Sequence, residues 1–313
     1  MSCFRWLRIL PMLGASLVVA WDVGHASDSA ACGGRAEFAL QILGSGGPEL
    51  DGGRASSGYV VWVNGRASLL VDAGGGSRLR FGETAARLQD LELLALTHFH
   101  VDHAGDVPAL IKAGYFSERD RPLLMSGPAG NQRFPGPADY LRGLFGDRAP
   151  YRYLGGALDG SEGQFELRPV ELPSEPSEEA RVFRRGNLSV ESIGVRHGPL
   201  PAVAYRVTAG TRSIVFAGDQ DGRVEAFWSF AKGADLLVAN MAIHENAGAA
   251  ARRLHATPGA IGRGAAKADV AHLLLSHLMR RSLAALEGSL AAVREFYGGK
   301  VTVAEDLQCI PIG

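Results

Sequence analysis

The chain has 313 residues, of which 46% are hydrophobic and 21% are charged, and its formal net charge is -1. This composition is ordinary for a globular protein with a sizeable core, and it excludes a disordered or low-complexity chain. The near-zero charge excludes a strongly basic protein that attracts nucleic acid through its overall field.

The N-terminus has the pattern of an export signal. Two arginines precede an apolar stretch at 9–21, and small residues follow up to Ala26. Such a pattern predicts a secretory signal peptide over residues 1–26, although a buried first helix is the alternative. The apolar run is too short for a permanent membrane span. We therefore expect a periplasmic or secreted protein without a membrane segment after signal removal, with a single folded domain over residues 33–313.

Two cysteines remain after signal removal, Cys32 and Cys309, at opposite ends of the chain. An oxidising compartment permits a disulfide between them. Closing so long a loop would contribute roughly 4–5 kcal/mol in the chain-entropy model. Both thiols can equally remain unpaired, so the sequence leaves this pairing open.

Short β-type segments dominate the first half of the chain. Strands are expected at 38–43, 59–63, 68–71 and 91–96, and a helix at 104–113. The Asn64-Gly65 pair between the second and third segments is a strong signal for a two-residue hairpin. The run at 91–96 is continuously apolar, as a strand buried on both faces would be.

The stretch 127–179 is rich in glycine, proline and charge, and we expect it to connect two halves and to form a rim. It includes a helix near 138–145 and a strand near 165–172. Beyond it, strands are expected at 188–195, 202–207, 213–216, 235–239, 270–275 and near 301, and helices at 258–267 and 282–296. Strands before helices in each half predict an α/β (α+β) fold with two mixed sheets face to face and helices outside.

The strongest chemical signal is the segment 97–103, with the sequence Thr-His-Phe-His-Val-Asp-His. It follows a buried strand and precedes a helix, so it lies where α/β proteins usually place their sites. Imidazole and carboxylate groups are suitable zinc ligands. His98 and His100 can converge on one ion, while Asp102 and His103 can hold a neighbouring ion. A polar surface loop is the alternative, but it does not require four such residues at this spacing.

This motif, His-x-His-x-Asp-His, resembles that of the metallo-β-lactamase superfamily. The resemblance implies three further ligands in chain order, and His197, Asp219 and His277 occupy strand ends that fit them. It also implies a four-layer αββα sandwich with two zinc ions per chain. The implied assignment places His98, His100 and His197 on the first ion, Asp102, His103 and His277 on the second, and Asp219 between both.

A dinuclear site of this kind lowers the pKa of a bridging water toward neutrality and so provides a hydroxide nucleophile. Asp102 is expected to orient or deprotonate that water, and Asp72 is a plausible partner for a ligand histidine. A bridging Asp219 in place of cysteine, together with His255 in His-Ala-Thr, resembles the ribonuclease Z-like branch. A histidine at that position resembles a proton donor or oxyanion stabiliser; a helix-entry residue is the alternative.

Several features depart from the tRNA-processing enzymes of that branch. Those enzymes insert a basic flexible arm between the third-motif histidine and the bridging aspartate, or elsewhere in longer forms. Here only about twenty residues separate His197 from Asp219. The acidic residue expected after the strand near Asp235 is replaced by the segment Ala-Asn-Met at 239–241. Export and the near-neutral charge also argue against RNA. Flavo-diiron relatives carry Glu where this chain has His100, which favours zinc hydrolysis over iron redox chemistry.

We therefore expect an exported dinuclear zinc hydrolase of a small phosphodiester, ester or related substrate, rather than of nucleic acid. A periplasmic β-lactam hydrolase and a metal-binding protein without turnover are the alternatives. Loops such as 127–163 decide the substrate and carry no motif. The sequence does not determine the oligomeric state, a dimer being one option.

Overall fold

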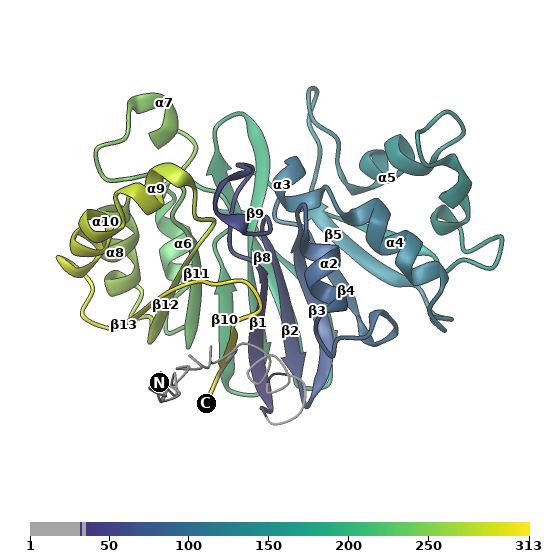
Figure 1. Cartoon of the computed structure of the whole chain (residues 1–313), viewed down its shortest axis with the longest axis horizontal. Helices are drawn as coiled ribbons and strands as arrows, with labels where there is room; N and C mark the ends of the chain where they lie inside the picture. Colours follow the sequence, from purple (N-terminus) through teal and green to yellow (C-terminus); the bar gives the residue numbers. More distant parts are fainter. Residues whose placement is uncertain (1–31, 33–35) are drawn as a thin grey trace, which may run out of the picture.

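The computed structural model describes residue 32 and residues 36–313. The expected signal peptide, residues 1–26, lies outside the described residues. Two seven-stranded sheets pack face to face, and helices cover the outer side of each sheet (Figure 1). The expected four-layer αββα sandwich is therefore confirmed.

The first sheet comes from the first half of the chain and the last strand. In spatial order its strands are β14 (Cys309–Pro311), β1 (Phe38–Gly44), β2 (Gly58–Val63), β3 (Arg66–Ala73), β4 (Leu93–Ala95), β5 (Leu123–Pro128) and β6 (Leu167–Leu172). Pairing is antiparallel from β14 to β3 and parallel from β3 to β6. The predicted hairpin joins β2 to β3, and Asn64 and Gly65 have φ values of 50° and 74°, as its two-residue turn requires.

The second sheet repeats this plan. In spatial order its strands are β13 (Lys300–Val303), β12 (His272–Ser276), β11 (Leu236–Asn240), β10 (Arg212–Phe216), β9 (Leu200–Ala209), β8 (Leu188–His197) and β7 (Glu179–Arg185). Pairing is antiparallel from β7 to β10 and parallel from β10 to β13. The two-fold echo expected from the sequence is thus present in the pairing of the strands.

The helices divide between the two outer layers (Figure 1). On the first sheet they are α2 (Ser77–Gly82), α3 (Val101–Ala104), α4 (Val107–Tyr115) and α5 (Pro137–Phe145). On the second they are α6 (Glu225–Phe230), α7 (Ala249–Arg252), α8 (Pro258–Lys267), α9 (Arg280–Ala284) and α10 (Leu286–Arg294). Short 3-10 helices occur at Asp51–Gly53, Leu88–Asp90 and Arg152–Leu158. Within the described part of the chain, every helix is too short or too polar for a bilayer span.

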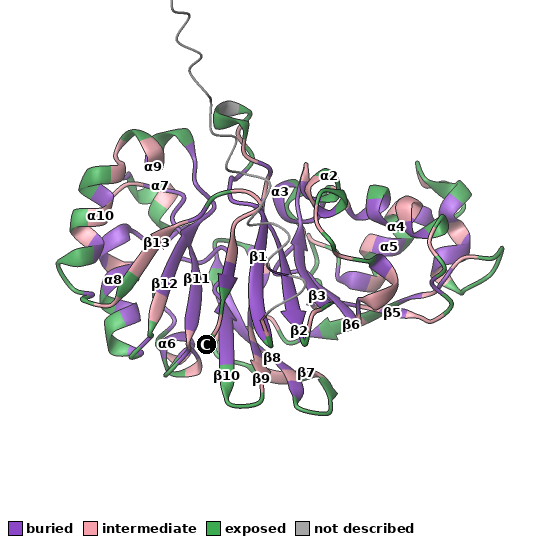
Figure 2. Cartoon of the chain, turned by 60° about the horizontal axis from the view of Figure 1, so that its bottom comes forward, coloured by how far each residue is buried: buried purple, intermediate pink, exposed green. Residues whose placement is uncertain are grey.

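Three hydrophobic clusters hold the layers together. One fills the space between the two sheets, with Leu40, Val61, Val203 and Phe216 among its fully covered side chains. The other two lie between each sheet and its helices. Figure 2 shows the central strands buried along their length, and the exposed residues on the helices and turns. Because both faces of these strands are covered, their sequences are continuously apolar rather than alternating.

Two predicted helices have the wrong bounds. The helix expected at 104–113 is divided into α3 and α4, because the amide of Asp106 donates to the Ala73 carbonyl (2.9 Å) instead of extending α3. Pro108 then lies in the first turn of α4, where its missing N–H costs no hydrogen bond. The helix expected at 282–296 is likewise two helices, α9 and α10, which meet at Ala285 with a ψ of 24°.

The stretch 127–179 lies mostly within the first half, and its last residues, 173–178, connect β6 of the first sheet to β7 of the second, as expected. It contributes α5 and β6, both near their predicted positions, and β6 pairs with β5 inside the first sheet. The strands β5, β7 and β14 and the helices α2, α6 and α7 were not predicted. All six are short or lack a clear apolar period, so local sequence gave little signal for them.

Cys32 and Cys309 form a disulfide, with their Cα atoms 5.6 Å apart. Cys309 begins β14 and pairs with Gln41 on β1. The bond therefore fixes the start of the described chain to its final strand, and it resolves the pairing that the sequence left open.

Candidate metal centre

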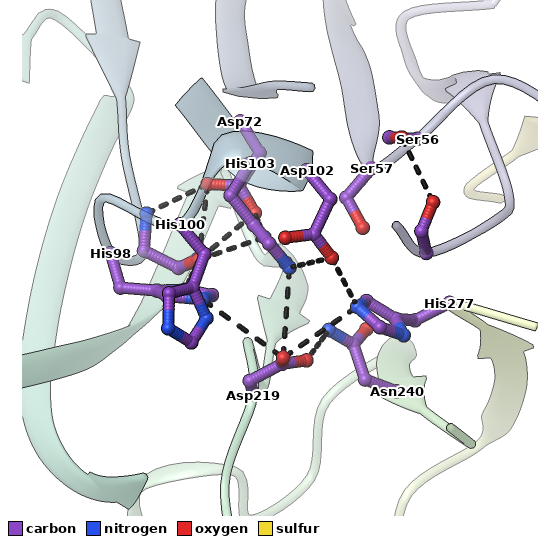
Figure 3. Close-up of polar contacts among 12 residues, drawn as sticks. Ser56, Ser57, Asp72, His98, His100, Asp102, His103, Asp219, Asn240 and His277 are labelled. Atoms are coloured by element: carbon purple, nitrogen blue, oxygen red, sulfur yellow. Dashed lines mark hydrogen bonds and ion pairs between the residues drawn. The ribbon is translucent and has the colours of Figure 1, made fainter. Parts of the chain in front are cut away.

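The seven predicted ligands converge at one edge of the sandwich, where strands of both sheets end. The metal-binding loop, residues 98–103, follows β4 and includes the start of α3. His197 ends β8, Asp219 follows β10 and His277 follows β12. In Figure 3 the Asp219 carboxylate lies between the histidines of that loop and His277. Residues almost 180 positions apart in sequence thus face one small volume.

The ligand atoms fall into two groups, within each of which all atoms lie within 4.8 Å of one another. The first group is His98, His100, His197 and Asp219, and the second is Asp102, His103 and His277. Apart from Asp219, which the family resemblance places between both ions, these are the two sets that it assigned to separate ions. Asp219 Oδ2 also lies 3.7 Å from His103 Nε2 and 3.6 Å from His277 Nε2, so it adjoins both groups.

Hydrogen bonds to the outer ring nitrogens fix the tautomers of two ligand histidines. His103 Nδ1 donates to Asp72 Oδ2 (2.8 Å), and His197 Nδ1 donates to the carbonyl of Leu254 (2.8 Å). A neutral imidazole with one nitrogen donating offers a lone pair on the other. With a metal ion in place of any proton there, both Nε2 atoms would direct lone pairs into the pocket, the arrangement in which histidine binds metal.

The distances between the ligand nitrogens, and one ring nitrogen without a hydrogen-bond partner, fit zinc. His100 Nδ1 lies 3.1 Å from His98 Nε2 and 3.4 Å from His197 Nε2, and ligands about 2.0–2.1 Å from one tetrahedral zinc are roughly 3.3 Å apart. His103 Nε2 is buried without a hydrogen-bond partner. A buried polar nitrogen without a partner is costly, and a metal ion would satisfy it. The residues present therefore fit the metal.

The electrostatics of the pocket favour positive charge. Burial raises the pKa of Asp219, but the surrounding histidines outweigh it and hold that pKa well below its usual range. Burial lowers the pKa of His103, yet the carboxylates of Asp72, Asp219 and Asp102 raise it to about 9. Burial and the neighbouring histidines hold the pKa of His98 well below its usual range. The centre thus combines carboxylates held in the charged form with a His98 imidazole held in the neutral form.

Asp72 fixes the metal-binding loop at its first turn. Its carboxylate accepts hydrogen bonds from the amide of Thr97 (2.7 Å) and from the Thr97 hydroxyl, besides the one from His103. Asp72 itself has a φ of 56°, a costly conformation that surrounding contacts must hold. Gly74 is required nearby, since a Cβ there would lie 2.0 Å from the Asp102 carbonyl oxygen. The predicted partnership of Asp72 with a ligand histidine is present in the structure.

The first half of the chain also holds His277 in place. The loop after β1 packs on its ring so closely that a Cβ on Gly47 would lie 2.7 Å from His277 Cε1. The next residue, Leu278, donates its amide to the Ser45 carbonyl (2.8 Å). His277 Nε2 lies 3.1 Å from Asp102 Oδ2. A ligand of the second sheet therefore depends on a glycine turn of the first.

His255 lies within the centre rather than only at a helix entry. Its Nδ1 is 3.7 Å from Asp219 Oδ2 and is buried without a hydrogen-bond partner. Its ring lies 5.4 Å from that of His197 and 5.7 Å from that of His277. Burial lowers the pKa of His255 to about 4, with the neighbouring histidines and Arg281 adding to the effect. The side chain is therefore neutral near neutral pH.

One contact of the centre was missed by sequence reasoning. Asn240 Nδ2 donates to Asp219 Oδ1 at 2.7 Å, which leaves Oδ2 facing the histidines (Figure 3). Asn240 ends β11, between the strands that carry Asp219 and His277. The sequence showed only that an amide replaces an acidic residue here; knowledge of the strand order would have placed it beside the bridging ligand.

Comparisons with known proteins agree with this geometry. The family model described as metallo-beta-lactamase superfamily matches residues 51–261. Ribonuclease Z of Methanosarcina acetivorans is 28% identical over 303 residues, covering 87% of this chain and 97% of the relative. Ribonuclease Z of Nocardia farcinica is 28% identical over 307 residues, with the same coverage. The crystal structure of human tRNase Z, short form, matches with a TM-score of 0.67 and 21% identity over 88% of this chain and 99% of that one, a likeness of fold.

Proposed function

The chain belongs to the metallo-β-lactamase superfamily and is a ribonuclease Z-like, metal-dependent hydrolase; from this premise we propose that it is an exported enzyme that uses two zinc ions to hydrolyse a small phosphodiester, ester or related substrate. One observation carries the proposal. Among the described residues, five imidazoles lie 3.6–3.9 Å from Asp219 Oδ2. A single carboxylate oxygen surrounded in this way suits a bridge between two cations.

The ligand set supports zinc in both positions. His98, His100 and His197 would hold the first ion and Asp102, His103 and His277 the second, with Asp219 shared. Imidazole nitrogens with few carboxylates and no thiolate suit zinc and related divalent metals. When bound, the two ions would act as Lewis acids and acidify a water toward neutral pH.

The side chains around the metals would then orient the reaction. Burial raises the pKa of Asp102, but hydrogen bonding to His277 and the charge of His103 hold it below its usual value. Asp102 therefore stays a carboxylate that can orient the attacking water and accept its proton. His255 is neutral near pH 7, so its N–H acts as a hydrogen-bond donor to the developing oxyanion or leaving group.

The compartment is part of the proposal. The disulfide between Cys32 and Cys309 supports an oxidising environment, since such bonds are rare in the reducing cytosol. The basic and apolar pattern of residues 1–26 supports export by a signal peptide.

RNA cleavage is the second candidate, and the relatives favour it. Their name, ribonuclease Z, goes against our expectation that nucleic acid is not the substrate. Two observations support a small molecule instead. Only β9, β10 and their short turns separate His197 from Asp219, leaving no room for an inserted arm, and the net charge is -1.

A substrate panel tests the proposal. Zinc-loaded mature protein would be assayed with bis(p-nitrophenyl) phosphate, p-nitrophenyl acetate, nitrocefin and a 3′-extended tRNA precursor, and Asp219→Ala would be the inactive control. We expect metal-dependent turnover of the diester or ester. A higher kcat/KM for the tRNA than for the diester and ester would replace the small-molecule proposal with RNA cleavage. A higher kcat/KM for nitrocefin would replace it with β-lactam hydrolysis. Absence of all metal-dependent turnover would overturn the enzymatic role.

A further inference from the structure

A small apolar pocket opens directly beside the first metal-binding group. Its volume is about 170 Å³, and its lining includes His100 together with the rings of Phe99, Phe134 and Tyr140. Leu200 and two prolines complete the wall. Since His100 Nδ1 faces His98 and His197, a group in this pocket lies next to the reacting bond of a substrate held at the metals.

The Tyr140 hydroxyl, one of the few polar groups of this wall, is already engaged. The Tyr140 hydroxyl donates to the Ala104 carbonyl at 2.7 Å, and burial raises the pKa of that hydroxyl. His100 directs its Nδ1 at the other metal ligands. The remaining lining side chains, from Phe99, Phe134, Leu200 and the prolines, are apolar. A polar group placed against these apolar side chains would therefore lose hydrogen bonds to water without replacement, which is costly.

Packing and hydrogen bonds position the aromatic rings that line the pocket. Phe99 belongs to the metal-binding loop, and its ring packs against Tyr140 with centroids 4.7 Å apart and planes 32° apart. A Cβ on Gly127 would lie 2.9 Å from Phe99 Cζ, so the glycine leaves room for that ring. Asn131 Oδ1 accepts from the amide of Phe134 at 3.0 Å and closes the turn that carries it. The rings are thus fixed relative to the metals.

The volume of the pocket matches that of a single six-membered ring. An apolar cavity of about 150 Å³ in a protein binds benzene, so 170 Å³ holds one six-membered ring. A nucleobase has a similar outline, but its polar edge would be buried against carbon. The lining therefore distinguishes an apolar ring from a base.

We propose that this pocket binds a compact apolar ring of the substrate, such as a phenyl or cyclohexyl group, attached close to the scissile bond. The inference rests on the proposed hydrolase function and narrows its substrate class to esters or phosphodiesters with one such group. Phe99, Phe134, Tyr140 and Leu200 are then specificity-determining residues.

A binding experiment tests the pocket without turnover. Ligand-observed NMR would measure benzyl alcohol and uridine on zinc-loaded mature protein and on Phe134→Ala, with Phe134→Leu as the conservative variant. Phe116→Ala is the matched control, since Phe116 is an exposed aromatic (76%) outside the pocket. We expect Phe134→Ala to weaken the binding of benzyl alcohol at least about fivefold, because apolar contact area is lost. Phe134→Leu should recover most of this affinity, and Phe116→Ala should leave it unchanged. Uridine binding as tightly as benzyl alcohol, or equal loss in Phe116→Ala, would overturn the proposal.

A kinetic comparison tests the same pocket during reaction. Benzyl acetate and ethyl acetate release alcohols of similar acidity, so they differ mainly in the ring; benzyl methyl and ethyl methyl phosphate form the matching diester pair. We expect kcat/KM to favour the benzyl compound by at least about tenfold, mainly through KM, and Phe134→Ala to remove that preference. Equal values for the two in the wild type would contradict the ring pocket. Because the binding experiment needs no hydrolysis, absence of turnover would count against the proposed function alone.

Discussion

The two halves of the chain supply the metal centre in different ways. The first half concentrates four ligands in the six residues from His98 to His103, on the loop after β4 and the first turn of α3. The second half supplies three ligands singly, at the ends of β8, β10 and β12. Yet each metal-binding group contains ligands from both halves. Neither half completes a site, so metal binding and the packing of the two sheets are linked.

The supports of the ligands differ in the same way. In the first half a side chain, Asp72, fixes His103, whereas in the second a backbone carbonyl, that of Leu254, fixes His197. The clustered ligands can be recognised from the sequence, and their side-chain support can be tested by mutation. The dispersed ligands are positioned by the order of the strands and by main-chain hydrogen bonds.

The largest expected effect comes from removing one ligand of each half. Asp219→Ala and His98→Ala should each lower kcat/KM on the order of a thousandfold, because both remove charge stabilisation at the reacting group. Asp219→Ala should lose zinc from both positions, since the carboxylate adjoins both groups, and His98→Ala mainly from one. Zinc per protein by mass spectrometry and turnover measure this. Full zinc content with full turnover in either variant would contradict the assignment.

The second prediction separates chemistry from metal binding within the second half. His255→Ala should slow kcat about a hundredfold, because a positioned hydrogen-bond donor to the leaving group is lost, while zinc content stays unchanged. His272→Gln is the matched control, as His272 bonds to Thr302 within the sheet. A parallel loss of zinc in His255→Ala would instead make His255 a ligand.

The third prediction concerns the side-chain support in the first half. Asp72→Asn should weaken zinc binding about 10- to 100-fold, because the amide no longer fixes the tautomer of His103 as a carboxylate does. Competition with a chelator measures the dissociation constant. An unchanged constant would show that Thr97 and the loop backbone are sufficient. The carbonyl that supports His197 has no side chain to replace, so this test is available for one half alone.

The smallest expected effect on activity comes from removing the disulfide between Cys32 and Cys309. Cys309→Ser should lower the free energy of unfolding by about 2–4 kcal/mol, while zinc content and kcat at 25 °C stay at wild-type values. Urea unfolding with and without a reductant measures the loss. If the variant kept its stability, or if reduction left the wild type unchanged, the disulfide would have no stabilising role.

The sequence determined the local features of this protein. The hairpin at Asn64-Gly65, the buried strands and the clustered ligands at 98–103 depend on neighbouring residues, so spacing and periodicity were enough to predict them. His197, Asp219 and His277 were found through the family resemblance rather than through spacing alone. Their individual sequence contexts would also suit ordinary polar residues at strand ends.

Tertiary structure alone decided the rest. The convergence of residues 98 and 277, the contact of Asn240 with Asp219 and the apolar pocket beside His100 depend on which strands become neighbours. The division of the expected helix at 104–113 likewise followed from a hydrogen bond to the end of β3. Such contacts join groups far apart in sequence, and they form only when the burial of both sheets offsets the entropy of closing long loops.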